Sequence, residues 1–121
     1  MLFGAGFRAN APRYDALLQD MRSPKSLEVD GPGLVLWAVG YGLRQGDVMA
    51  FEITAPDGQS FMAERFEQPK TQIRRMRFVG RSNKNGISQP GTYRGVVRVL
   101  RKSAGAPLIS VERRVSVELV K

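Results

Sequence analysis

The sequence predicts an all-β protein built as an antiparallel β-sandwich. After Ser26 the 121-residue chain divides into seven short segments separated by glycine, proline, asparagine and aspartate. Apolar and polar residues alternate along most of these segments, which is typical of strands with one buried face. We therefore expect residues 1–25 to form a lead-in and residues 26–121 to form the sandwich domain.

The lead-in holds the one helix-like pattern in the chain. Between Pro12 and Pro24, apolar side chains fall near the i, i+3, i+4, i+7 spacing of a helix face, at Tyr14, Leu17, Leu18 and Met21. Pro12 suits a helix start and Pro24 would end it. We expect a short helix or an extended segment here, packed against this domain or an upstream one.

The predicted strands follow in order at residues 26–30, 34–43, 48–54, 60–67, 71–81, 92–101 and 108–120. The second of them, "LVLWAVGYGL", is nearly all apolar, which predicts a strand buried on both sides or at the centre of the sandwich. The sequence "APDGQ" predicts a tight turn, because Pro56 presets one torsion and Gly58 tolerates a positive φ.

The last two strands show the alternation most clearly. We expect Tyr93, Val97 and Val99 to face inward, with Arg94 and Arg98 outward. On the final strand Arg113 falls on the apolar face, so an edge position or a bulge should let it reach water. Seven such strands favour a sandwich of the immunoglobulin or fibronectin type III kind, with a small barrel as the alternative.

Two aromatic residues receive structural roles. Trp37 lies in the most apolar strand and is predicted to be the central core residue, so that Trp37→Ala would cost about 3–5 kcal/mol of stability. Tyr93 follows the Pro90–Gly91 turn near the start of the penultimate strand. In such sandwiches a tyrosine at this position turns its hydroxyl back onto the preceding connection.

Composition excludes several kinds of active site. The chain contains no cysteine and no histidine, so a Ser-His-Asp triad, a Cys-His pair or a histidine-based zinc site within it is impossible. No glycine-rich phosphate loop is present, and no apolar run reaches the roughly 20 residues of a membrane span. We expect neither an enzyme nor a cofactor or metal; a carboxylate-dependent hydrolase is the remaining catalytic alternative.

Positive charge is concentrated in the second half of the chain. The net charge is +8, and the stretch from Gln68 to Val111 holds ten basic residues and no acid. Alternation alone would place most of these charges in solvent whatever the function, so a merely solvated face is one interpretation. Such a face would normally mix both signs, and the excess of one sign therefore supports the other interpretation, a basic face for an anionic partner. Its candidate residues are Arg74, Arg75, Arg77, Arg81, Arg94, Arg98 and Arg101, with Met76 and Phe78 expected on the inward side of the same strand.

Several segments resemble one known family. They are "LFGAGF", "LVLWAVGYGLRQGD", "TAPDG", "PKTQIRRMRFVGR", "QPGTYRGVVRVLR" and "RRVSVEL". Together they look like the C-terminal immunoglobulin-like module attached to some bacterial lysostaphin-type (LytM-like) peptidoglycan endopeptidases.

The resemblance implies a non-catalytic accessory module of a larger exported protein of the periplasm or cell envelope. In that family the zinc and catalytic groups lie in a separate upstream domain. The implied partners are that catalytic domain or a cell-wall or other anionic envelope ligand. The alternative is a cytoplasmic nucleic-acid-binding β-protein that uses the same arginines.

Overall fold

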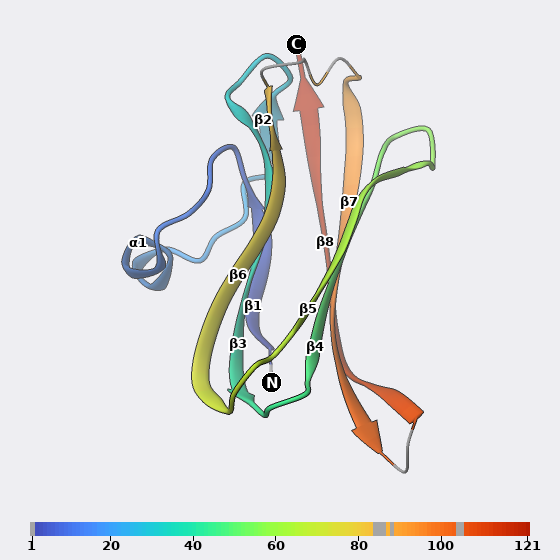
Figure 1. Cartoon of the computed structure of the whole chain (residues 1–121). Coiled ribbons are helices and arrows are strands. Elements are labelled where there is room, and N and C mark those ends of the chain that lie inside the picture. The colour runs from blue at the N-terminus through green and yellow to red at the C-terminus, as the bar shows by residue number, and fades with distance from the viewer. Residues whose placement is uncertain (1, 84–86, 88, 104–105) are drawn as a thin grey trace.

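Two packed β-sheets make up the chain (Figure 1). The computed structural model describes residues 2–83, 87, 89–103 and 106–121, and within these it contains eight strands and one short helix, α1 (Tyr14–Gln19). The three-stranded sheet has the order β1 (Leu2–Arg8), β3 (Gly33–Leu43), β6 (Gln72–Ser82). The five-stranded sheet has the order β2 (Ser26–Glu28), β8 (Ala106–Val120), β7 (Gly91–Ser103), β4 (Val48–Thr54), β5 (Ser60–Glu67).

The topology is that of an immunoglobulin-like or fibronectin type III-like sandwich. The first, third and sixth strands form one sheet, while the hairpin β7–β8 and strand β4 form the centre of the other. Neighbouring strands are antiparallel, apart from the short β2, which pairs with β8 in parallel. The predicted all-β sandwich is therefore confirmed.

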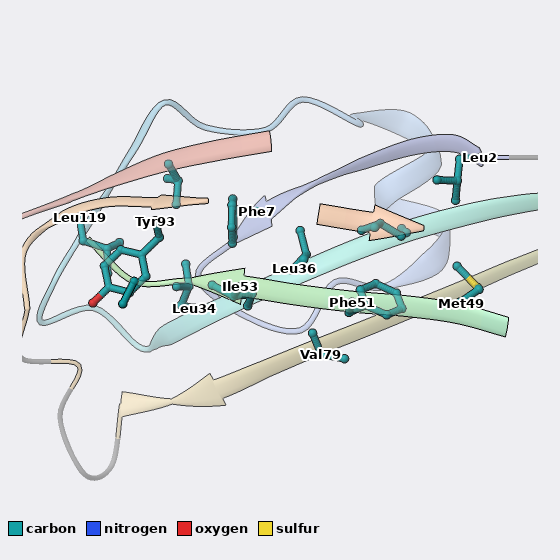
Figure 2. Packing of buried hydrophobic residues seen from close by; sticks show 14 of the residues in the cluster. Leu2, Phe7, Leu34, Leu36, Met49, Phe51, Ile53, Val79, Tyr93 and Leu119 are labelled. Atoms are coloured by element: carbon teal, nitrogen blue, oxygen red, sulfur yellow. The ribbon is translucent and has the colours of Figure 1, made fainter. Parts of the chain in front are cut away.

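The main core lies between the two sheets (Figure 2). Phe7 and Leu36 come from the three-stranded sheet, and Phe51 and Ile53 come from β4 opposite; each is at most 1% exposed. The sheets approach each other closely at Gly95, where an added Cβ would lie 2.9 Å from both Phe7 and Leu36 atoms. A side chain at that position would have to push the sheets apart.

Tyr93 anchors the start of β7, as the sequence predicts. Its ring is buried at the end of the main core (Figure 2), and its hydroxyl donates a 2.8 Å hydrogen bond to the backbone carbonyl of Gln89. Gly91, between them, has a φ of 131°, a conformation that favours glycine. The hydroxyl thus fixes the connection that precedes β7.

Trp37 is fully buried but does not lie between the sheets, which corrects its predicted place in the central core. Side chains alternate along β3, so Leu34, Leu36 and Ala38 face the five-stranded sheet while Trp37 and Val39 point to the opposite side. There they form a second, smaller core with Leu17, Met21 and Met76. The prediction that this strand is buried on both sides is confirmed.

The segment that contains α1 covers this second core (Figure 1). After β1 the chain returns over the sheet, and the Phe7 amide donates a 2.9 Å hydrogen bond to the Ser23 hydroxyl. Glycines make room for it: an added Cβ would lie 2.6 Å from Met21 at Gly4, and 2.9 Å from the Trp37 ring at Gly6. The boundary at residue 25 stays a prediction; β1 itself pairs with β3.

Arg113 escapes to water at an edge, as predicted. It lies opposite Val97 in the β7–β8 register, on a stretch of β8 that β2 does not reach. Its guanidinium is exposed and donates a 3.4 Å hydrogen bond to the Leu2 carbonyl of β1. An arginine therefore bridges the two sheets on this side of the sandwich.

The single tryptophan reports which core a mutation disturbs. Leu17→Ala removes part of the cover over Trp37, so the tryptophan emission of the folded protein should move to longer wavelength. Phe51→Ala empties the other core, costs about 3–5 kcal/mol of stability and should leave the emission of the folded protein unchanged. The reverse pattern of emission shifts would place Trp37 between the sheets.

Candidate anion-binding site

Arg75 and Arg77 of β6 point to the opposite side from the one predicted. Val79 belongs to the main core, and Arg77 and Arg75 share its side of the strand. Met76 and Phe78 instead face away from the five-stranded sheet, where Met76 packs on the second core and Phe78 is 42% exposed. The predicted orientation of all four residues is therefore wrong.

An arginine can occupy the inward side here because β6 is an edge strand. From that edge the long side chains reach the seam between β6 and β5, the edge strand of the facing sheet. The Arg77 guanidinium lies 4.8 Å from the centre of the Phe66 ring, and the Arg81 guanidinium lies 4.5 Å from the Phe61 ring. Both are cation–π contacts, so cations close one side of the sandwich.

The arginines of the seam, and Arg74 on the outer side of β6, have no acidic counterpart in the described structure. Among the described residues, no carboxylate oxygen lies within 4.0 Å of the guanidinium groups of Arg74, Arg75, Arg77 or Arg81. The Nε atoms of Arg75 and Arg77 are buried without a hydrogen-bond partner in this part of the chain. Burial, and then the neighbouring charge of Arg75, lower the pKa of Arg77 from its usual value. All four cations are thus unneutralised in this part of the chain, and Arg75 and Arg77 are also partly desolvated.

Exposed apolar side chains flank the same strand. Of the large apolar residues described as exposed, Ile73 (74%) and Phe78 (42%) belong to β6, and Tyr41 (53%) lies opposite Arg74 on β3. Phe78 also lines a shallow pocket of about 220 Å³ beside Arg81, together with residues 9–11 of the lead-in. The site that emerges, which we call the β6 edge, consists of Arg74, Arg75, Arg77, Arg81, Ile73 and Phe78.

The β7 arginines belong to a different surface. Arg94 and Arg98 lie on the outer face of the five-stranded sheet, as predicted, because Tyr93 and Val97 take the inner face. Arg98 donates to Glu112 at 2.7 Å and lies 3.6 Å from Glu52. Hydrogen bonds from Arg98, and then from Arg114, lower the pKa of Glu112. This face mixes both signs of charge and neutralises Arg98 locally.

Arg101 is also neutralised, in a buried polar cluster at the β3–β4 turn. Its Nε and Nη2 atoms donate to the two carboxylate oxygens of Asp47 at 3.0 and 2.8 Å. Asp47 is 2% exposed and accepts a further 2.9 Å hydrogen bond from the Arg44 amide. Burial alone would raise the pKa of Asp47, but the hydrogen bonds from Arg101 and Arg44 bring it below its ordinary value. Arg101 therefore has a structural role.

The seven predicted binding arginines thus do not form one face. Four gather on the β6 edge, two lie on the outer face of the five-stranded sheet, and one is held by Asp47. Sequence reasoning did not assign Phe61 and Phe66 to the site, because only the facing of the two sheets brings β5 beside β6. Lys84, a further basic residue between Gln68 and Val111, lies outside the described residues.

Comparisons with known proteins add no family to these observations. No protein-family model, curated protein or solved structure matches the chain. Within the described residues, no group of three or more acidic side chains is placed to hold a metal ion. No helix in that part of the chain has the length and apolar character to cross a membrane.

The Asp47–Arg101 pair makes stability depend on pH. The pKa of Asp47 is lower in the folded than in the unfolded protein. The ionised carboxylate therefore contributes its full stabilisation of the folded state above the ordinary pKa of 3.8. This contribution is lost as the pH falls through the pKa of the folded protein. Asp47→Asn should lower the free energy of unfolding at pH 7 by about 1–3 kcal/mol and flatten its acid dependence. Urea unfolding from pH 7 to pH 2.5 measures both effects. Asp30→Asn, at an exposed position, serves as the control; a wild-type acid profile in Asp47→Asn would contradict this role.

Proposed function

We propose that this chain is a non-catalytic binding module that holds an anionic partner on the β6 edge. The observation that carries the proposal is that four arginines lie together on a single strand without a carboxylate partner in the part of the chain that the structure describes. Arg98 and Arg101 each have a carboxylate within 4.0 Å, whereas the four arginines of β6 have none among the described residues. Cations held on a surface without counter-charges are suited to an external anion.

The resemblance to immunoglobulin-like modules of lysostaphin-type endopeptidases supports a location for this activity. On that basis we propose an accessory module of a larger cell-envelope protein, which positions a neighbouring peptidoglycan hydrolase or binds an anionic envelope ligand. The absence of histidine and cysteine from the sequence agrees with a catalytic site elsewhere in such a protein. The chemistry required of the partner is negative charge on an extended surface.

Charge neutralisation at the β6 edge tests this proposal. A variant with glutamine at positions 74, 75, 77 and 81 should lose most of its binding to purified peptidoglycan sacculi. A control with the same change in net charge removes four exposed arginines that lie elsewhere, at positions 65, 94, 113 and 114, and should keep its binding. Circular dichroism checks that both variants fold. Equal loss in the two variants would reduce the effect to net charge and contradict the proposal.

Nucleic acid is the second candidate partner, and one observation favours it. Phe78 and Tyr41 are exposed beside Arg74 and Arg81, and single-stranded nucleic acid is held by aromatic stacking together with basic side chains. Measuring the binding of an oligothymidylate instead of sacculi tests this second candidate. Binding should weaken with salt, and removal of four phosphate contacts should lower the slope of log K against log salt by about 3. An oligonucleotide that does not bind at low salt removes this candidate.

A further inference from the structure

β6 is an edge strand, and one of its two sides has no strand partner in the described part of the chain. It pairs with β3 in one regular register from Gln72 to Ser82, and on its other side the described residues provide no strand partner. β5 lies across the seam in the other sheet and contacts β6 through the Arg77 and Arg81 side chains, without strand pairing. The backbone N–H and C=O groups along such an edge are open to a further strand.

The features that usually prevent strand addition are scarce on β6. Protected edges are short, bulged, interrupted by proline or charged. β6 carries four arginines, but it is 11 residues long, has no register shift against β3 and contains no proline. Ile73 and Phe78 leave apolar surface exposed on its two sides. The edge is guarded by positive charge alone.

The positive charge of β6 determines which kind of strand could add to this edge. Arg75 and Arg77 point to the same side of the strand, and alternate residues of a strand are about 7 Å apart. An added strand has the same repeat, so carboxylates at alternate positions would match these guanidinium groups in register. A second copy of β6 would instead bring arginines against arginines, which is unfavourable. Charge complementarity therefore favours an acidic strand over self-pairing.

We propose that the β6 edge binds an extended acidic peptide segment as an additional strand of the three-stranded sheet. This inference rests on the proposed function and specifies its partner. Backbone hydrogen bonds from the open edge would hold the peptide. Arg75 and Arg77 would pair with alternate Asp or Glu side chains, while Phe78 and Ile73 would offer apolar contacts on either side.

Three synthetic peptides separate strand addition from general attraction of anions. The first alternates glutamate with valine over about nine residues, a normal strand length. The second replaces each glutamate with glutamine, and the third keeps the glutamates but carries N-methyl groups on alternate backbone amides. By fluorescence anisotropy the first should bind about tenfold or more tightly than the second, because charged hydrogen bonds are lost. The third should bind as weakly as the second, because N-methylation blocks strand pairing.

A charge exchange tests the register. The variant Arg75→Glu with Arg77→Glu should lose the glutamate peptide and gain a peptide that alternates lysine with valine. The same exchange at Arg94 and Arg114, on the outer face of the five-stranded sheet, should leave binding of the glutamate peptide unchanged. Amide hydrogen exchange of residues 72–82 should slow when the glutamate peptide binds.

Each outcome decides between the two proposals. If the N-methylated peptide binds as well as the first, strand addition is wrong, although an anion site on β6 stands. If neither glutamate peptide binds but sacculi or the oligonucleotide do, the partner is not an acidic peptide. If the charge-exchange variant does not fold, the three peptides with the wild-type protein still decide, and if no anion binds at all, the proposed function fails with the inference.

Discussion

The structure depends on the need to cover both faces of β3. Leu34, Leu36 and Ala38 on one face and Val35, Trp37 and Val39 on the other are all at most 7% exposed. The five-stranded sheet covers the first face, and the returning lead-in with Leu17 and Met21 covers the second. Because burial of each large apolar side chain contributes about 1.5–3 kcal/mol, neither cover is dispensable. β1 and β6 then pair with the two sides of this strand and become the two edge strands of the sheet.

Arginine solves the packing problem that such an edge creates. The inward side of β6 must meet the facing sheet at its margin, where a short apolar side chain would leave a gap. Arg77 and Arg81 instead lay their side chains over Phe66 and Phe61 and keep their charge near solvent. Arg113 does the same on the other side by bonding to the Leu2 carbonyl. The β6 arginines differ from Arg113 because several of them lie next to one another. The side chains that stabilise this edge therefore also form a surface that attracts anions.

Much of this architecture is readable from the sequence, and the errors in side-chain orientation have one origin. Alternation located seven of the eight described strands and the edge position of Arg113, and the Pro90–Gly91 turn located the Tyr93 hydrogen bond, because glycine and proline mark turns and apolar residues mark faces. β1 was not predicted as a strand and lies within the expected lead-in. Alternation also assigned the β6 side chains to two opposite sides of the strand. It does not show which side faces the other sheet. Charged residues were assigned to solvent, although an edge allows the reverse. Trp37 was misplaced for a related reason: both faces of its strand are apolar, and only the fold shows that the lead-in covers one of them.

Both proposals depend on which side of β6 faces the other sheet. Proton NMR of the Arg77 and Arg81 side chains tests this orientation most directly. Methylene protons next to guanidinium groups that lie over aromatic rings are shifted upfield by the ring currents. We predict such shifts for Arg81 and Arg77, lost selectively in Phe61→Leu and Phe66→Leu respectively. Unshifted arginine resonances, accompanied by nuclear Overhauser contacts from Phe78 to Phe51 in the main core, would show that β6 presents its other side and would contradict the account.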